Sequence, residues 1–184
     1  MKPKIFDDFF DKHLLDYICY SVQHPEYPWS YNSSINKTFG TEPWMFGFSR
    51  KFIDINDYEI KACPEDKLFF PLFLKLHEEF GRPISDIVRA RTVMMLRSPS
   101  NTLHAPHQDM GGESHLTFIL YLNDSDGSTI IYNENEHSEN YTIQDKIEPK
   151  KNRLLMFDGS YFHAGQSPSQ HNNRVLLNIN YRGL

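Results

Sequence analysis

Apolar residues recur at helical spacing in two places in the first half of the chain. Between about residues 5 and 22 the apolar positions return every three or four residues, which predicts an amphipathic helix. The stretch from Glu65 to Phe80 repeats the pattern, with Pro64 placed to begin a helix and Gly81 placed to end it. Pro71 lies inside this second stretch and is expected to kink or split the helix.

The segment between these two stretches has a different composition. Residues 27–55 are rich in aromatic side chains, proline and asparagine, and the run from Trp44 to Phe52 is compatible with a strand. Core and lid packing is the simpler interpretation of this segment, ahead of a substrate-binding surface.

From about Ile87 the pattern changes to short apolar, β-rich runs separated by turn residues. We expect strands at residues 88–96, 116–122, 129–132, 141–147, 154–157 and 174–181. The second and third of these runs are expected to pair as a hairpin across the turn at 123–127. Short strands at nearly regular spacing favour a sandwich or barrel. The chain is therefore predicted to be α+β, with helices first and a β-barrel or jelly roll after them.

Composition and charge narrow the class of protein. The 184 residues include 19 basic and 24 acidic side chains and carry a formal charge of -5, which gives no electrostatic basis for binding nucleic acid. The two cysteines, Cys19 and Cys63, are too few for a disulfide scaffold and lack zinc-ligand spacing. No signal peptide and no membrane-spanning apolar run is recognisable. We expect a cytoplasmic protein without nucleic-acid or membrane partners, whose oligomeric state stays open.

Three residues have the spacing of a metal site. His107 and Asp109 are two residues apart, so on an extended chain both side chains point to the same face. His163 follows the apolar run 154–157 and its turn, and a strand from the opposite sheet could bring it to the same point. Two imidazoles and one carboxylate on one face of an ion leave its other face open, which is typical of non-haem Fe(II) sites. The His-x-Asp tripeptide alone is common by chance and needs this context.

A buried cation is predicted further along the chain. Alternation in the run 174–181 puts Arg174, Leu176, Asn178 and Asn180 on one face, and a guanidinium followed by amides is unusual for a core strand. A buried arginine needs an anion, and its planar fork matches a carboxylate. An exposed arginine on an edge strand is the alternative.

Taken in order, these features resemble the Fe(II)- and 2-oxoglutarate-dependent oxygenases, most closely the prolyl-4-hydroxylase-like branch with its small bacterial and phage forms. The resemblance covers about half the chain, from Val88 to Tyr181. It rests on segments 106–109, 120–124, 126–129, 147–153, 157–159 and 163–164, and on Arg174. It implies a double-stranded β-helix, the cupin-like jelly roll, and a single oxygenase domain over residues 1–184. Residues 1–86 would be its helical and lid region, and 87–184 its jelly-roll core.

The resemblance also implies roles for individual residues. His107, Asp109 and His163 would bind the iron, and Arg174 would bind the distal carboxylate of 2-oxoglutarate with the Tyr121 hydroxyl as its partner. The implied cofactors are Fe(II), with 2-oxoglutarate and O2 as co-substrates, and ascorbate as an optional addition. Related halogenases lack the carboxylate ligand, so its presence here favours hydroxylation of an unactivated C–H bond with release of succinate and CO2.

Arginines upstream of the His-x-Asp motif depart from the family pattern. Arg97 stands ten residues before His107, where the family often has tyrosine. We expect Arg97 either to contact 2-oxoglutarate or substrate or to point to solvent, and we expect Asn178 to make such a contact from the later strand. Arg89 and Arg91 would share the face of Arg97 on a regular strand, as either a polar outer face or the mouth of a pocket.

The substrate is the least determined part of the interpretation. By resemblance a peptidyl prolyl residue is favoured, and the aromatic segment 27–48 could clamp an extended peptide. The alternative is a small molecule such as a free amino acid, with its carboxylate on Arg97 or Arg91, and damaged nucleic acid ranks behind both. A non-catalytic jelly roll that binds a metal or small ligand is a further alternative. Arg174 and Tyr121 argue against it, because a plain metal site needs no carboxylate clamp.

Overall fold

The structure is a computed structural model that describes residues 1–35, 45–54, 64–111 and 113–183. Its helices are α1 (Lys12–Gln23) and α2 (Phe70–Phe80), with 3-10 helices at Pro64–Phe69 and Ile84–Asp86. Its strands are β1 (Lys4–Phe6), β2 (Ser30–Asn32), β3 (Gly47–Asp54), β4 (Ile87–Leu96), β5 (His115–Tyr121), β6 (Thr129–Tyr132), β7 (Ile143–Ile147), β8 (Leu154–Asp158), β9 (His163–Gly165) and β10 (Asn173–Arg182).

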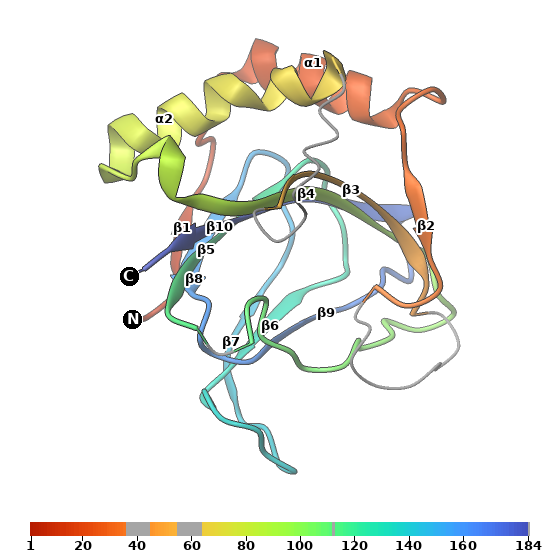
Figure 1. The fold of residues 1–184 in the computed structure, drawn as a ribbon. Coiled ribbons are helices and arrows are strands. Elements are labelled where there is room, and N and C mark those ends of the chain that lie inside the picture. The colour runs from red at the N-terminus through yellow and green to blue at the C-terminus, as the bar shows by residue number, and fades with distance from the viewer. Residues whose placement is uncertain (36–44, 55–63, 112, 184) are drawn as a thin grey trace.

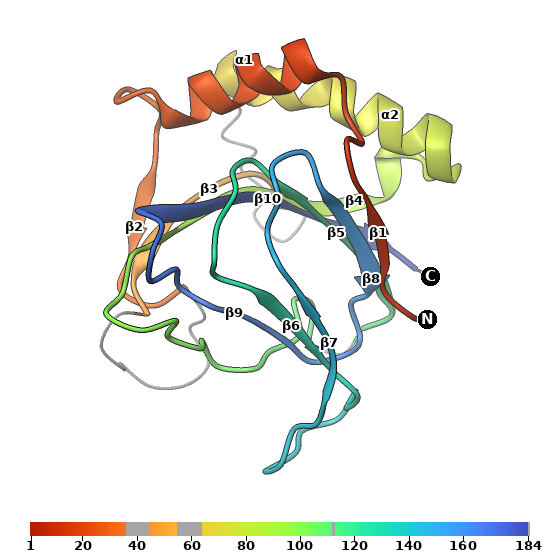
Figure 2. The same ribbon diagram turned by 180° about the vertical axis from the view of Figure 1, so that it is seen from behind.

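The strands form two antiparallel sheets, and the helices lie outside them. The larger sheet has the order β1-β8-β5-β10-β4-β3-β2, and the smaller one has the order β7-β6-β9. Figures 1 and 2 show α1 and α2 across the outer face of the larger sheet, with the smaller sheet on its opposite side. This arrangement confirms the predicted α+β jelly roll with external helices. Among the described residues, no helix is both long enough and apolar enough to cross a membrane.

The first helix begins later than the apolar pattern predicts. The side chain of Asp11 accepts a hydrogen bond of 2.9 Å from the Leu14 N–H and so caps α1 at its N-terminus. Ile5 and Phe6 fall on β1, which pairs with β8 at the edge of the larger sheet. The prediction of one helix from residue 5 was wrong, because the apolar residues at 5 and 6 serve a strand pairing that spacing alone does not reveal.

The second helical stretch is divided as its proline predicts. A 3-10 helix ends at Phe69, and α2 begins at the next residue, so that Pro71 occupies its first turn, where a missing N–H costs nothing. Gly81 ends α2 in the left-handed conformation, with φ of 64°, and its N–H donates to the His77 carbonyl at 2.8 Å. The ring of Phe69 stacks on Phe52 of β3 at 4.7 Å, which attaches the helical layer to the sheet.

The expected hairpin of residues 116–122 with 129–132 is not formed. β5 pairs with β8 and β10 in the larger sheet, whereas β6 pairs with β7 and β9 in the smaller one. After β5 the Asn123 side chain donates to the Asn173 carbonyl at 3.1 Å and accepts from the Val175 N–H at 2.7 Å. These bonds tie the connection to the start of β10, and the chain then crosses to the other sheet. The hairpin prediction was wrong because a short polar turn can also join strands of two sheets.

The two faces of β10 separate two apolar cores, as the alternation predicts. Val175, Leu177 and Ile179 pack into the core between the larger sheet and the helices. Leu176 packs into the second core, between the sheets. The polar residues that alternate with them therefore face the inside of the jelly roll. The predicted strand from Trp44 is observed from Gly47 on, while residues 36–44 of the aromatic segment lie outside the described residues.

Candidate metal centre

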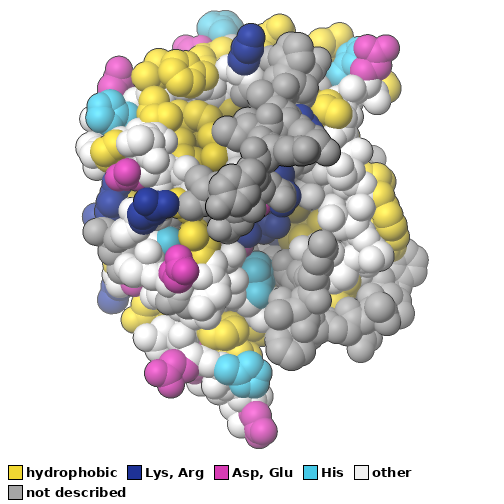
Figure 3. Space-filling model, in the orientation of Figure 1, with side chains coloured by type: hydrophobic (Ala, Val, Ile, Leu, Met, Phe, Trp, Pro, Cys, Tyr) yellow, Lys and Arg dark blue, Asp and Glu magenta, His cyan; other side chains and the backbone are white. Residues whose placement is uncertain are grey.

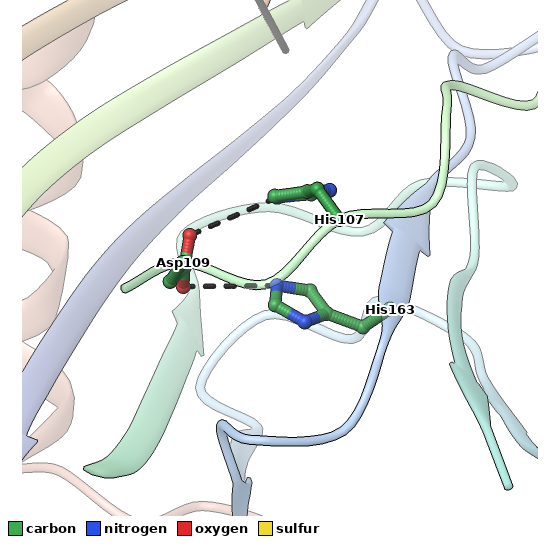
Figure 4. Close-up of side chains that lie close together, drawn as sticks. All are labelled: His107, Asp109 and His163. Carbon is green, nitrogen blue, oxygen red and sulfur yellow. Dashed lines mark ion pairs between the residues drawn. The ribbon is translucent and has the colours of Figure 1, made fainter. Parts of the chain in front are cut away.

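Two histidines are held side by side by their own backbones. His107 lies on the extended segment before β5, and His163 is the first residue of β9. They exchange two backbone hydrogen bonds, of 3.0 Å from the His107 N–H and 2.9 Å from the His163 N–H. This antiparallel bridge brings the two ring centroids to 4.4 Å, and in Figure 4 Asp109 lies beside both rings.

The three side chains present their ligand atoms to one point. One donor atom each from His107, Asp109 and His163 lies within 4.8 Å of the others. The two Nε2 atoms are 3.7 and 3.6 Å from the carboxylate oxygens of Asp109 (Figure 4). Each Nδ1 lies 3.3 Å from a backbone carbonyl, that of Ala105 for His107 and that of Tyr161 for His163. A proton on Nδ1 donates to that carbonyl and leaves Nε2 free as a metal ligand.

Asp109 is buried among hydrogen-bond donors. Its side chain is 1% exposed, and one carboxylate oxygen accepts from the amides of Asn178 and Asn180, each at 3.0 Å. The other oxygen pairs with Arg89 at 2.5 Å and Arg91 at 3.3 Å. Burial alone would raise the pKa of Asp109, but these two guanidiniums and His163 outweigh burial and hold the pKa well below its usual range. The carboxylate is therefore ionised and fixed in orientation.

His107 is also held in the protonation state that metal binding requires. Burial, followed by the repulsion from His163, lowers the pKa of His107 to about 3. Its imidazole is neutral at physiological pH, and a neutral imidazole is the form that ligates a metal. Two imidazole nitrogens and one carboxylate on a single side suit a divalent transition metal with open positions.

Arg174 lies inside the jelly roll without an acidic partner among the described residues. It is 1% exposed, and its guanidinium donates to the Thr129 hydroxyl and contacts the Met95 sulfur at 3.1 Å. Its Nε has no hydrogen-bond partner in the described part of the chain. Gly165 makes this placement possible, because a Cβ at that position would lie 2.6 Å from a guanidinium nitrogen of Arg174. An unpaired buried cation is costly, so this position calls for an anion.

Tyr121 approaches Arg174 through a third residue that the sequence did not single out. The Tyr121 hydroxyl lies 2.6 Å from the hydroxyl of Thr129, to which Arg174 also donates. The guanidinium carbon lies 5.7 Å from the centre of the Tyr121 ring. Thr129 shares the inward face of β6 with the buried Ile131, and a polar residue at an inward position of a strand is the signal that could have identified it.

Two cavities meet at this group of residues. A narrow cavity of about 40 Å³ is lined by the two histidines, Thr129, Arg174 and Asn178. A wider cavity of about 310 Å³ is lined by His107, Asp109, Arg89, Arg91 and residues of β2 and β3. Figure 3 shows Lys and Arg side chains near the middle of this face, close to a histidine. The metal-binding residues thus lie between a narrow inner space and a wider, cationic outer one.

The upstream arginines divide between two environments. Arg89 and Arg91 on β4 face Asp109 and line the wider cavity, which is the mouth-of-a-pocket alternative. Arg97 is exposed just after β4, and its Nε donates to the Ser169 carbonyl at 2.7 Å. It lines neither cavity, so the structure brings Asn178 to the site and leaves Arg97 outside it. Asn180 is a further contact to Asp109, on the same face of β10 as Asn178.

His104 leads to a prediction about acid stability. It is 1% exposed, its Nε2 lies 2.9 Å from the Ser167 hydroxyl, and burial, then the charge of Arg174, lower the pKa of His104 to about 4. Between the ordinary value of 6.5 and about 4, the unfolded chain binds a proton that the folded chain does not, so acidification destabilises the fold. His104→Gln keeps a polar group near Ser167. We expect the melting temperature of this variant to fall less than that of wild type when the pH is lowered from about 7 to about 5. Parallel pH profiles of the two proteins would contradict this assignment.

The sequence of the jelly-roll half matches one family. Residues 93–182 match the sequence model of the 2OG-Fe(II) oxygenase superfamily. The three candidate ligands and Arg174 all lie within this segment. No curated protein sequence matches the chain.

Solved structures share the fold at low sequence identity. An oxidoreductase of the 2OG-Fe(II) oxygenase family from Burkholderia pseudomallei has a TM-score of 0.70 at 13% identity, covering 98% of this chain and 84% of its own. A second structure is a prolyl hydroxylase from Trichoplax adhaerens in complex with a hypoxia inducible factor oxygen degradation domain peptide fragment. It has a TM-score of 0.62 at 16% identity and covers 98% of this chain and 83% of its own. A prolyl-4-hydroxylase from Pseudomonas putida has a TM-score of 0.59 at 12% identity and covers 99% of this chain and 92% of its own. At these identities the likeness is one of fold.

Proposed function

The chain belongs to the 2OG-Fe(II) oxygenase superfamily, and from that membership we propose how its residues divide the work and what it oxidises. The enzyme uses Fe(II) and 2-oxoglutarate, as its family implies. In our proposal His107, Asp109 and His163 hold the iron, and Arg174 binds the distal carboxylate of 2-oxoglutarate. The product is a hydroxylated carbon, and the favoured substrate is a prolyl residue of a peptide.

One observation supports this division of work most strongly. The narrow cavity that begins at the two histidines also contains the buried guanidinium of Arg174, for which no acidic partner is present among the described residues. A metal site alone would not require a buried cation in the same cavity. A dicarboxylate that reaches from the metal to Arg174 accounts for both features, whereas a non-catalytic metal site accounts for only one.

The bound cofactors supply the oxidising chemistry, and the protein supplies orientation. Asn178 and Asn180 fix the carboxylate of Asp109, while the backbone carbonyls of Ala105 and Tyr161 fix the two imidazole rings. Thr129 and Tyr121 orient the guanidinium of Arg174. As an iron ligand, Asp109 would also favour hydroxylation over halogenation, because related halogenases lack the carboxylate ligand and so leave room for a halide.

Two kinds of substrate fit the site to different degrees. The fold is shared with prolyl hydroxylases, one of them in complex with a peptide fragment, and the wider cavity of about 310 Å³ accommodates one residue of a peptide. A free amino acid is the second candidate, and it is favoured by Arg89 and Arg91, which face that cavity close to the metal-binding residues.

Turnover of 2-oxoglutarate tests the proposed function. Protein supplied with Fe(II), ascorbate, O2 and 2-oxoglutarate is expected to form succinate, and a proline-containing peptide is expected to raise the rate and gain one oxygen atom. The matched control is the same peptide with alanine in place of proline. Equal stimulation by both peptides would contradict the prolyl assignment, and the absence of succinate from folded protein under every condition would contradict the oxygenase assignment.

A further inference from the structure

Two arginines of β4 face the same carboxylate oxygen. Arg89 and Arg91 are two residues apart on the strand and therefore share a face, and both contact Oδ1 of Asp109, at 2.5 and 3.3 Å. Their side chains are only 17% and 18% exposed. A guanidinium carries its positive charge at any physiological pH, so the two side chains repel each other.

The negative charge of Asp109 would not offset the positive charges of Arg89 and Arg91 once Asp109 binds a metal. Its charge is then shared with a divalent cation, which adds positive charge beside the two guanidiniums. The negative charges of Asp109 and of the dianionic 2-oxoglutarate would then be matched by the metal and Arg174, so Asp109 would no longer offset the charges of Arg89 and Arg91. Asp54 also acts electrostatically on Arg91, and it pairs with Lys51 at 2.9 Å. Among the described side chains that line the wider cavity, Arg89, Arg91 and Lys51 are cationic, and Asp54 is the one acidic residue besides Asp109, so positive charge is in excess there.

The hydrogen-bonding capacity of the pair is also only partly used. Arg89 donates through Nε to the Asn180 side chain at 2.9 Å, and a terminal nitrogen of its guanidinium contacts Asp109. The Nε of Arg91 is buried without a hydrogen-bond partner among the described residues. Both side chains line the wider cavity, together with His107 and Asp109. Two guanidinium forks at the wall of a cavity match the geometry of a carboxylate.

We propose that the substrate presents a carboxylate to Arg89 and Arg91, within a few bonds of the carbon that is oxidised. This inference rests on the proposed function and names its substrate class. The carboxylate belongs either to a free amino acid or to an acidic group beside the oxidised residue of a peptide. Arg91 lines both the wider cavity and the narrow one that contains Arg174, whereas Arg89 lines the wider cavity and not the narrow one. Arg89 is therefore the member of the pair that is assigned to substrate and not to the distal end of 2-oxoglutarate.

Paired acids and amides test this proposal in the wild-type protein. Protein loaded with Mn(II) and 2-oxoglutarate, which binds substrate without turnover, is titrated by calorimetry with the twenty common amino acids, each as free acid and as primary amide. A second arm uses capped peptides with Glu or Gln next to proline. We expect a preference of at least about tenfold for the carboxylate in one arm, as expected for a charge-assisted bidentate pair. The arm in which it occurs identifies the source. Equal affinity of acid and amide in both arms, or no binding in either, would overturn the proposal.

Variants test whether the preference for a carboxylate over an amide comes from Arg89 and Arg91. Arg89→Leu is expected to remove the preference for the acid, and Arg89→Lys to retain part of it, because lysine keeps the charge and loses the fork. Arg97→Leu is the matched control, since that guanidinium lies outside both cavities, and it should retain the full preference. Melting temperatures verify that each variant is folded. A preference that survives Arg89→Leu, or a variant that instead weakens only 2-oxoglutarate binding, would overturn the assignment.

Calorimetry and turnover separate this inference from the proposed function. Binding of a carboxylate probe is measured without turnover, whereas succinate formation with Fe(II) and O2 is measured separately. Acid-selective binding without any succinate would support the carboxylate site and contradict the oxygenase function. Succinate formation that is stimulated equally by acids and amides would support the function and overturn the carboxylate site.

Discussion

His163→Ala is expected to abolish 2-oxoglutarate turnover and to weaken Fe(II) binding by at least about 100-fold, while the protein remains folded. Loss of a supporting partner of a metal ligand already costs about 10–100-fold in affinity, so loss of the ligand itself should cost more. His163 is buried and its ring lies 5.0 Å from that of Phe157, so truncation should cost on the order of 2 kcal/mol of stability. A domain of ordinary stability tolerates that loss. Equilibrium dialysis with Fe(II) and a succinate assay measure the two effects.

His13→Ala provides the matched control for this variant. His13 is exposed on α1, so the same substitution there removes an imidazole without touching the candidate site. We expect unchanged metal affinity and turnover. Retention of full turnover by His163→Ala would contradict the ligand assignment, whatever the control does.

Arg174→Leu is expected to raise the KM for 2-oxoglutarate by at least about 30-fold without lowering the melting temperature. Removing one member of a buried charge pair costs about 2–5 kcal/mol of binding, which corresponds to that range or more. In the unliganded protein, however, the guanidinium has no acidic partner among the described residues, so an apolar replacement relieves a buried charge. The variant should therefore keep or gain stability while it loses affinity. Steady-state kinetics and thermal unfolding measure these two opposite effects.

Arg97→Leu is the matched control for Arg174→Leu, because it removes an arginine that lies outside the candidate site. The Arg97 guanidinium is exposed on the Ser169 carbonyl, so its loss should leave the KM for 2-oxoglutarate unchanged. Equal changes in KM for Arg97→Leu and Arg174→Leu, or a large loss of stability in the latter alone, would contradict the role assigned to Arg174.

The sequence predicts the inside of the jelly roll better than its connections. The alternation of Arg174, Leu176 and Asn178 depends only on the period of a strand, and the structure has the same alternation. By contrast, the placement of Ile5 on a strand and the choice of a partner for the strand 129–132 depend on pairings between distant segments. A local pattern does not encode which distant edge a strand meets, and both predictions failed for that reason.

The candidate site shows the same division. The convergence of His107 and Asp109 follows from local geometry, whereas His163 was proposed from its place after the strand 154–157 and then supported by the family resemblance. Thr129 was not singled out, and Asn180 was placed on the face of Arg174 without a role at the site, because these contacts arise only where β6 and β10 face the same interior. Arg97 was preferred to Arg89 as a site residue because it stands ten residues before His107. Arg89, Arg91 and Arg97 are nevertheless all at odd positions, so on a regular strand they would share one face. The strand ends before Arg97, which frees its side chain to turn outward.

Anaerobic titration of the metal-free protein with Fe(II) and 2-oxoglutarate tests the central claim most directly. A visible charge-transfer band is expected only when both are present. It should be absent from His163→Ala, and in Arg174→Leu it should require at least about 30-fold more 2-oxoglutarate. This result would show that the triad and Arg174 serve one bound co-substrate. A folded wild-type protein that gives no band at saturating Fe(II) and 2-oxoglutarate would contradict the account.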